Sequence, residues 1–591
     1  MSANPSSSEQ RLFFGLLSLG ALAGCAGYVA LVLGTATWAE ARTLDAIFPY
    51  DGWHIQPFTA LALQRLHYAL AAAALALAAG WLGLGLGTRS GRGQLVATAR
   101  AVAQAGRQLG GQWAALAGWQ RRVALAGLVG LTVVRGYLST GYLPYGDDAV
   151  SYEFFVRHRL LAVAAYYPMP NNHILANTLS WGFYQVYPSF WVSMRLPVLL
   201  TSTVGSGLLF VGLLRWVGFR GALLATGAFS GLQLSLYYAS NGRGYWLVIL
   251  LAGVVFLCLL RLVDTAADAV AGDRAAWVGL LGAGILGCYT VPTFSYVLAS
   301  AFSWLAVQAV RRRAWGQLGP AVVVGLVVGL SAAVLYVPVL LVSGAKMLVD
   351  NDFMQPRSLY DFWRALPEYA WLTEGFLAGQ RSIGAVVTVG GLALFGHLWH
   401  RAATGRLPAG PALRVRQVGL PALWFMLLPY GLMAVQRVYP PERTLLYKAW
   451  FFFLLVALVA ENVNWSRRRR WLAGAAAGVF LLYQVGTVVR LNYLGRGANP
   501  DQRALYTWLV QHPTTQPVLV PNYGLWLWLR VHAHVQAPTQ LWRTEYQVRP
   551  GQQYEYVVTQ RADPRPAQAG RLVWATSDCL IYSGVVAAGP H

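Results

Sequence analysis

The chain has 591 residues, of which 56% are hydrophobic and only 11% are charged. Soluble globular domains carry about 25% charged residues, so too few charges remain to cover a water-soluble body of this size. This composition excludes a large soluble enzyme, a disordered protein and a disulfide-rich scaffold. It indicates an all-α polytopic membrane protein.

The net charge of +23 comes almost entirely from arginine, since Lys346 and Lys448 are the only two lysines. A strongly basic chain can bind nucleic acid. Here, however, the basic residues lie in short segments between apolar runs, which is the pattern that sets membrane topology. We therefore expect no nucleic-acid partner. The four cysteines have no spacing typical of a metal site or a disulfide framework.

Thirteen apolar runs are long enough to cross a membrane. They cover 12–37, 57–87, 123–141, 192–214, 221–238, 245–262, 275–291, 294–310, 318–342, 382–399, 417–435, 444–462 and 472–490. With a cytoplasmic N-terminus, the inner segments hold 22 basic residues and four acids, the bias expected of cytoplasmic loops. Thirteen spans then place the C-terminus outside, as in a bacterial inner-membrane protein with a periplasmic tail. Leu22–Cys25 resembles a lipoprotein cleavage box, but the apolar run continues past it, which favours an uncleaved span.

Three parts are expected along the chain. Residues 1–122 hold two spans and a basic cytoplasmic connector. Residues 123–490 hold the remaining spans and two long outer loops, 142–191 and 343–381. Loop 343–381 is amphipathic, which fits either a helix lying over a site or a solvated face. Residues 491–591 have mixed polarity and predict a small outer α/β domain, with strands near 517–521, 554–559 and 572–575 and a helix at 503–510.

Polar side chains gather at the predicted outer ends of the spans. Asp147 and Asp148 follow a Pro/Gly turn, where they could either cap the next helix or act in chemistry. Asn172-His173, Asn241–Tyr245 and the turn that ends at Arg443 fall on the same side. No acid lies well inside a predicted span, which argues against an ion-coupled transporter.

In this order and spacing, these motifs resemble the C-type (GT-C) glycosyltransferases, in particular the branch of the protein mannosyltransferases and the aminoarabinose transferases. The acidic pair Asp147-Asp148 matches the family's first outer loop, and Pro170–His173 matches its Asn/His/Pro motif. Arg195–Pro197, Asn241–Tyr245 and Arg443 match later elements. The resemblance covers roughly residues 123–490. The chain departs from it by two extra N-terminal spans and by Asp-Asp where many members have Asp-Glu.

The resemblance implies transfer of a sugar from a polyprenyl-phosphate carrier to an acceptor on the non-cytoplasmic face. One carboxylate would serve as base, Asp147 or else Asp148, and a single displacement would invert the anomeric carbon. The implied donor-binding residues are Asn172, His173, Arg243, Tyr245, Arg443 and Lys448. Lys448 could instead anchor its span. Partners would be the lipid-linked sugar, membrane lipids, and a glycan, lipid or protein acceptor. No cofactor or metal is expected.

A carrier of lipid-linked sugars is the competing interpretation. It would use Arg65 and Arg135 as a basic path and would need no general base. A carrier should tolerate Asp147→Asn, whereas a transferase should lose turnover and keep donor binding.

Overall fold

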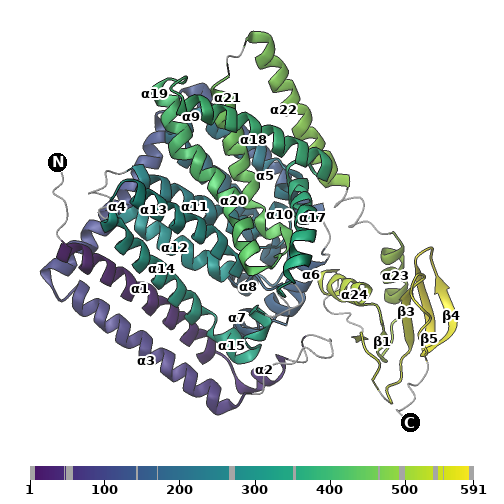
Figure 1. Cartoon of the computed structure of the whole chain (residues 1–591). Helices are drawn as coiled ribbons and strands as arrows, with labels where there is room; N and C mark the ends of the chain where they lie inside the picture. The colour runs from purple at the N-terminus through teal and green to yellow at the C-terminus, as the bar shows by residue number, and fades with distance from the viewer. Residues whose placement is uncertain are drawn as a thin grey trace.

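The chain folds into a large helical body with a smaller α/β domain beside one end of it (Figure 1). This computed structural model describes residues 7–44, 47, 58–141, 144, 146–168, 171–264, 273–349, 354–463, 466–490, 500–536, 543–549 and 551–584. The fold class predicted from composition, a polytopic helical protein with a small α/β C-terminal domain, is confirmed.

Within the described residues, eleven helical segments are long and apolar enough to cross a membrane. They are Ser7–Gly34 (α1), Ala60–Gly85 (α3), Gly118–Gly141 (α5), Trp191–Ser230 (η3 and α9), Tyr245–Asp264 (α11), Pro292–Arg311 (η5 and α13), Leu318–Leu335 (α14), Arg381–Ala403 (α18), Ala409–Gln436 (α19, η7 and α20), Glu442–Glu461 (η8 and α21) and Trp471–Val488, within α22 (Arg467–Val488). Two of the thirteen expected spans are absent from this set. Span 275–291 forms α12 (Arg274–Thr290), which is 17 residues long, and span 221–238 is divided between α9 and α10 (Gln233–Ser240).

A sharp break inside α9 (Leu196–Ser230) separates the expected spans 192–214 and 221–238. Gly218 has φ +66°, a left-handed conformation that favours glycine, so the helix changes direction there. The second arm begins with backbone amides that have no partner within the helix. Glu461 at the end of α21 (Tyr447–Glu461) accepts the Gly221 N–H at 3.1 Å and so caps that arm.

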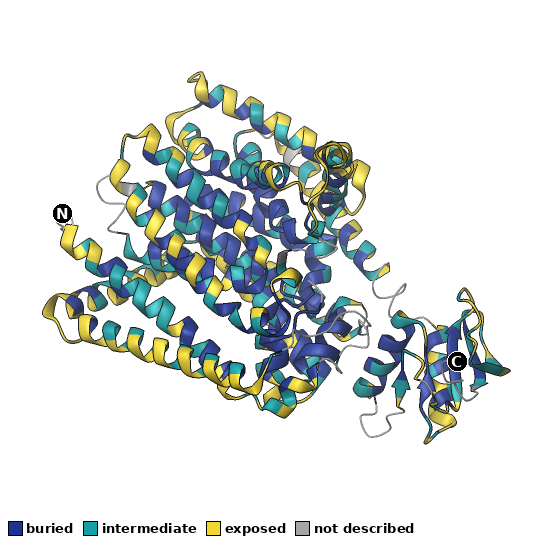
Figure 2. Cartoon of the chain, turned by 60° about the horizontal axis from the view of Figure 1, so that its bottom comes forward, coloured by how far each residue is buried: buried dark blue, intermediate teal, exposed yellow. Residues whose placement is uncertain are grey.

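Burial separates central helices from peripheral ones (Figure 2). In the most apolar stretch of the Glu442–Glu461 segment 78% of residues are buried, whereas in α3 the share is 6%. The exposed side chains of α3 and α22 are largely Leu, Val, Ala and aromatic residues, which suits contact with lipid tails. The amphipathic connector forms α4 (Arg89–Ala114), which packs against α1, α9 and α12.

Several short helices cover the end of the body that carries the predicted motifs. They are α6 (Asp147–Ser151), η2 (Tyr152–Val156), α7 (Leu160–Ala165), α8 (Ile174–Val186), α15 (Val337–Val342), α16 (Lys346–Val349) and η8 (Glu442–Leu445), and the longer helix α17 (Leu359–Ala378) lies with them. The helix expected in loop 343–381 is α17. It packs on α18 and η8, and the Tyr369 hydroxyl donates to the Pro440 carbonyl at 2.8 Å.

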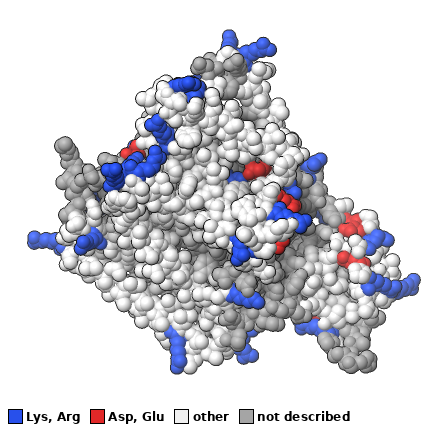
Figure 3. Space-filling model, in the orientation of Figure 1, with Lys and Arg blue, Asp and Glu red and all other residues white. Residues whose placement is uncertain are grey.

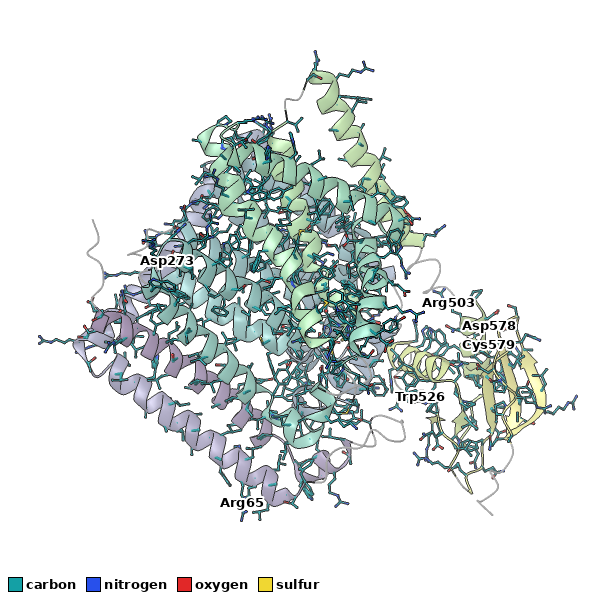
Figure 4. The ribbon with its side chains drawn as sticks, viewed as in Figure 1. Arg65, Asp273, Arg503, Trp526, Asp578 and Cys579 are labelled. Carbon is teal, nitrogen blue, oxygen red and sulfur yellow. The ribbon has the colours of Figure 1, made fainter. Side chains whose placement is uncertain are left out.

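The C-terminal domain is a five-stranded sheet with two helices. Its strand order is β2-β1-β3-β5-β4, with β1 parallel to β2 and β3, and β5 antiparallel to β3 and β4. The elements are α23 (Pro500–Gln511), β1 (Val518–Leu519), α24 (Tyr523–Gln536), β2 (Thr544–Glu545), β3 (Tyr556–Gln560), β4 (Ala569–Ala575) and β5 (Cys579–Gly584). Helix α24, which carries Trp526, lies between this sheet and the helical body (Figures 1 and 4).

Candidate active site

The two adjacent aspartates at the start of α6 occupy different environments. Asp148 is fully buried, and its Oδ2 lies 2.7 Å from the Arg195 Nη2. Arg195 is itself buried and donates from Nη1 to the Ser240 carbonyl at 2.7 Å. Asp148 therefore fixes α6 against the helical body. The helix is capped by Gly146 without a side-chain hydrogen bond, so the alternative that either aspartate is its N-cap is wrong.

Asp147 keeps 41% of its side chain exposed and faces two guanidinium groups. Its Oδ2 lies 3.2 Å from the Arg443 Nη2 and 3.9 Å from the Arg243 Nη2. Arg443 is 34% exposed, whereas Arg243 is almost completely buried. The pair Asp147–Arg443 thus forms the open part of the cluster, and Arg243 forms its floor.

Arg243 is held in place from several directions. Its Nη1 donates to the Ser151 Oγ at 2.7 Å and to the carbonyls of Asn171 at 2.8 Å and Asp147 at 3.2 Å. These bonds join the α10–α11 turn to both outer motifs that precede it in the chain. A guanidinium fixed in this way needs no reorganisation when an anion approaches it.

His173 is a buried neutral ring beside Arg243. Its Nδ1 accepts the Gly244 N–H at 3.1 Å, and its Nε2 lies 3.3 Å from the Arg243 Nη2. Burial, together with the positive charges of Arg243 and Arg443, holds the pKa of His173 well below its ordinary value of 6.5. Gly244 allows this contact, because a Cβ there would lie 2.9 Å from the His173 Nδ1.

Tyr245 links the neutral ring to the exposed arginine. Its hydroxyl accepts a hydrogen bond from the Arg443 Nε at 2.8 Å, and its ring packs edge-on against His173 with centroids 4.7 Å apart. Tyr238 packs on the other side at 4.2 Å. The structure therefore brings Asp147, His173, Arg243, Tyr245 and Arg443 together. Tyr142 and Tyr145, which the sequence places where they could stack on a sugar ring, lie outside the described residues.

Asn172 braces the loop and is not turned toward this cluster. Its Nδ2 donates to the carbonyls of Val163 at 2.8 Å and Tyr166 at 3.0 Å, and its Oδ1 accepts from the Asn177 Nδ2 at 2.9 Å. These bonds use both amide protons and the amide oxygen on the protein itself. Asn172 thus holds the turn that presents His173.

Lys448 has a carboxylate partner that the sequence gave no reason to expect. Its Nζ lies 2.6 Å from the Glu374 Oε1 and also bonds to the Thr373 Oγ1 and the Tyr430 hydroxyl. Glu374 accepts a further bond from Thr388. Both members of the pair are buried or nearly so. The charge of Lys448 is therefore neutralised within the protein, where it joins α17 to α21.

Glu153, in the turn that continues α6, is a buried acid that the sequence analysis did not select. Its Oε2 lies 2.6 Å from the Arg157 Nη1 and 2.9 Å from the His534 Nδ1, and its Oε1 binds Arg530. Burial opposes the charge of Glu153. The hydrogen bond from His534 and the charges of Arg157 and Arg530 outweigh burial and lower its pKa to about 2.

Arg530 and His534 belong to α24, so Glu153 fastens the C-terminal domain to the helical body. Phe154 and Trp526 stack beside this ion pair, with centroids 6.2 Å apart and planes at 14°. The segment that begins with Asp147 therefore ends in contact with the C-terminal domain. No sequence signal pairs these residues, because Glu153 and Arg530 are 377 positions apart.

Among the residues that the structure describes, no group of three or more His, Cys, Asp or Glu side chains could hold a metal ion. The two arginines of the carrier hypothesis do not line a shared path. Arg65 points away from the bundle on the exposed helix α3 (Figure 4). Arg135 in α5 is fully buried, bonded to the Ser202 carbonyl at 2.9 Å and to the Ser206 Oγ.

The arrangement of helices matches that of a solved membrane enzyme. The crystal structure of ArnT from Cupriavidus metallidurans bound to undecaprenyl phosphate aligns with 81% of this chain and 100% of its own, with a TM-score of 0.51 and 14% sequence identity. The chain has the fold of a C-type glycosyltransferase. ArnT in the apo state aligns with 79% of this chain and 99% of its own, with a TM-score of 0.49 and 13% identity.

A weaker likeness is found to the oligosaccharyltransferase AglB from Archaeoglobus fulgidus in complex with an inhibitory peptide and a dolichol-phosphate. It has a TM-score of 0.42 and 13% identity over 75% of this chain and 70% of that chain. No protein-family model matches the chain, and no curated protein sequence matches it.

Proposed function

We propose that this protein is a membrane glycosyltransferase that moves a sugar from a polyprenyl-phosphate carrier to an acceptor hydroxyl. The observation that carries the proposal is the open carboxylate of Asp147, 3.2 Å from the half-exposed guanidinium of Arg443 and 3.9 Å from the fixed guanidinium of Arg243. A base next to an anion site is what this transfer requires. The shared fold with ArnT supports the same class of reaction.

In the proposed step, Asp147 removes the proton from the acceptor hydroxyl while the oxygen of that hydroxyl attacks the anomeric carbon. The bond between that carbon and the phosphate oxygen breaks, and the polyprenyl phosphate leaves as an anion. Such a leaving group needs charge neutralisation and no proton, and a guanidinium suits it because it can bind phosphate with two N–H groups. A single displacement with one base inverts the anomeric centre.

The donor phosphate has a direct way to activate the base. Without substrate, Arg443 pairs with Asp147 at 3.2 Å. When the phosphate binds Arg443, it competes for the same N–H groups and frees the carboxylate to accept a proton. Arg243 stays fixed by Ser151 and Asn171. The neutral ring of His173 contributes packing or one N–H.

The remaining assignments are part of the same proposal. Asp148 positions α6, Asn172 positions the His173 turn, and Lys448 joins two helices, so all three act on the architecture around the donor. We also propose that the site and the C-terminal domain face the periplasm of a bacterial inner membrane. The arginine-rich opposite end supports this orientation, because Arg261 and Arg312 lie at the far ends of α11 and α13, and Arg215 lies just before the break in α9.

The test is release of polyprenyl phosphate by purified protein in nanodiscs, given a panel of polyprenyl-phosphate sugars and candidate acceptors. Asp147→Asn should abolish release and keep donor binding. Glu555→Gln, which removes an exposed carboxylate of the C-terminal domain, is the matched control and should behave as the unchanged protein. Equal release by Asp147→Asn and the unchanged protein would rule out the assigned base. Donor translocation without release would favour the carrier hypothesis.

A further inference from the structure

At the end of the helical body opposite Asp147, a pocket of about 640 Å³ opens between four helical segments. Its walls come from the last turns of α11 and α13 (Ser295–Arg311), from the end of α18, and from the continuous segment of α19, η7 (Val415–Gly419) and α20. Helix α11 begins at the candidate site with Tyr245 and reaches this pocket at Val263. The pocket is therefore separate from the proposed catalytic site by nearly the length of a span.

Three arginines converge on this pocket from two regions of the chain, Arg311 and Arg312 at the end of α13 and Arg416 in η7. Two of them are held by backbone carbonyls: the Arg312 Nη1 donates to Val263 at 2.7 Å, and the Arg416 Nη2 donates to Ala402 at 3.0 Å. Among the described residues that line the pocket there is no Asp or Glu. Within the described part of the chain, none of the three arginines has a carboxylate within ion-pair distance.

An acid close to the pocket is already engaged elsewhere. Asp264 follows Val263 directly, but its carboxylate pairs with Arg215 and accepts the Gln417 Nε2 at 3.2 Å. Three like charges around one hollow repel one another, and an anion in the hollow removes that cost. Guanidinium groups held by backbone carbonyls still have N–H groups available for a phosphate oxygen.

The rest of the lining is apolar and suits a molecule with a hydrocarbon part. Val263, Leu413 and Leu420 form walls, and Trp399 stands at the pocket with 47% of its surface exposed. Tryptophan at a helix end is typical of the membrane–water interface. Figure 3 shows a largely uncharged surface over much of the helical body, with charged side chains along its outline and in a cluster on the side toward the C-terminal domain.

We propose that this pocket binds the phosphate headgroup of an anionic phospholipid from the leaflet opposite the candidate site, with the acyl chains against the apolar walls. Basic pockets between membrane helices bind such headgroups. Arginines that only set topology can be scattered over the loops. Here two segments about a hundred residues apart place three arginines around one hollow, and two of those arginines are fixed by backbone carbonyls.

The experiment measures lipid retention by the full-length purified protein with native mass spectrometry, using dioleoyl phosphatidylglycerol, dioleoyl phosphatidylcholine or inorganic phosphate as the probe. The unchanged protein should retain phosphatidylglycerol and not phosphatidylcholine. The Arg312→Gln/Arg416→Gln double variant should bind phosphatidylglycerol about tenfold more weakly or worse, because each basic residue near the surface adds to the attraction. Thermal unfolding in detergent checks that this variant is folded.

The matched control is Arg121→Gln/Arg122→Gln. It removes the same amount of charge from two exposed residues in the first turns of α5. It should retain phosphatidylglycerol as the unchanged protein does. If the control loses as much phosphatidylglycerol as the double variant, the lipid is held only by the general attraction between basic residues and anionic lipid. That result would overturn the proposal. Binding of inorganic phosphate with no preference between the lipids would overturn the lipid assignment. If the double variant does not fold, Arg311→Gln alone gives the same comparison at an exposed side chain.

Discussion

The helical segment 147–156 carries three acids, and the first and last of them, Asp147 and Glu153, differ in almost every respect. Asp147 is 41% exposed and meets Arg443 at an open face, whereas Glu153 is fully buried among Arg157, Arg530 and His534. An open acid–arginine pair can exchange partners with a substrate. A buried one cannot do so without leaving charges unpaired in a low dielectric. The same kind of acid–arginine pair thus attaches the C-terminal domain at one end, and we propose that it takes part in the reaction at the other.

Arg443→Met gives the largest effect of the four changes below, because it removes the guanidinium that would neutralise the leaving phosphate. We expect the turnover rate to fall by roughly 10²–10³-fold, the scale on which removing one charge-stabilising donor acts. Arg443→Lys should keep part of the rate, since the charge remains and the bidentate geometry is lost. The measurement is release of polyprenyl phosphate under saturating donor. If Arg443→Met is fully active, the pair Asp147–Arg443 is not part of the reactive site.

Glu153→Gln tests the buried ion pair at the other end of segment 147–156. It leaves Arg157, Arg530 and His534 without their shared acid. Breaking a fully buried ion pair costs about 3–5 kcal/mol, and the cost here is smaller because Arg157 and Arg530 are 23% and 34% exposed. We expect the C-terminal domain to detach from α6 and η2, with faster cleavage by added protease in the segment before α23. Glu555→Gln, which changes an exposed carboxylate of the C-terminal domain, is the control and should leave the attachment unchanged. If the C-terminal domain stays attached in Glu153→Gln, the stacking of Phe154 on Trp526 is enough to hold it.

The attachment should also depend on pH in a direction that Glu153 fixes. Its pKa is lowered from 4.5 to about 2 in the folded protein, so its contribution is complete above about pH 4.5 and is lost as the pH falls toward 2. Protease sensitivity of the junction should therefore rise over that window in the unchanged protein. Glu153→Gln should show no such rise. A transition in both proteins would assign the pH dependence to other groups.

The buried pair Lys448–Glu374 should act in stability and not in catalysis, as the ion pair of Glu153 does. Replacing both residues should change sugar transfer least. Lys448→Met alone leaves Glu374 buried without its partner, and we expect it to lower the thermal unfolding temperature in detergent. Lys448→Met/Glu374→Met removes both charges and should recover most of that loss. Sugar transfer by the double variant should stay within about threefold of the unchanged protein. Loss of donor binding in the double variant would show that Lys448 contributes to the donor site.

Local sequence was sufficient for the features that depend on neighbours in the chain. Membrane spans follow from runs of apolar residues, so most of the expected spans appear as long helices, and α17 and β3 fall where amphipathicity and alternation predict them. The break at Gly218 lies between the expected runs 192–214 and 221–238, where the sequence predicts that the chain turns. The sequence does not show that Glu461, from another helix, caps the arm that follows.

The sequence by itself determined a polytopic helical protein with its polar motifs at one end of the spans, because hydropathy and loop charge act locally. The tertiary structure alone decided what each polar residue does there. It buried Asp148 against Arg195 and left Asp147 open, and it gave Lys448 a carboxylate 74 positions away and Glu153 an arginine 377 positions away. The physical reason is that burial and ion pairing depend on distance in space, which adjacent letters of the sequence do not encode.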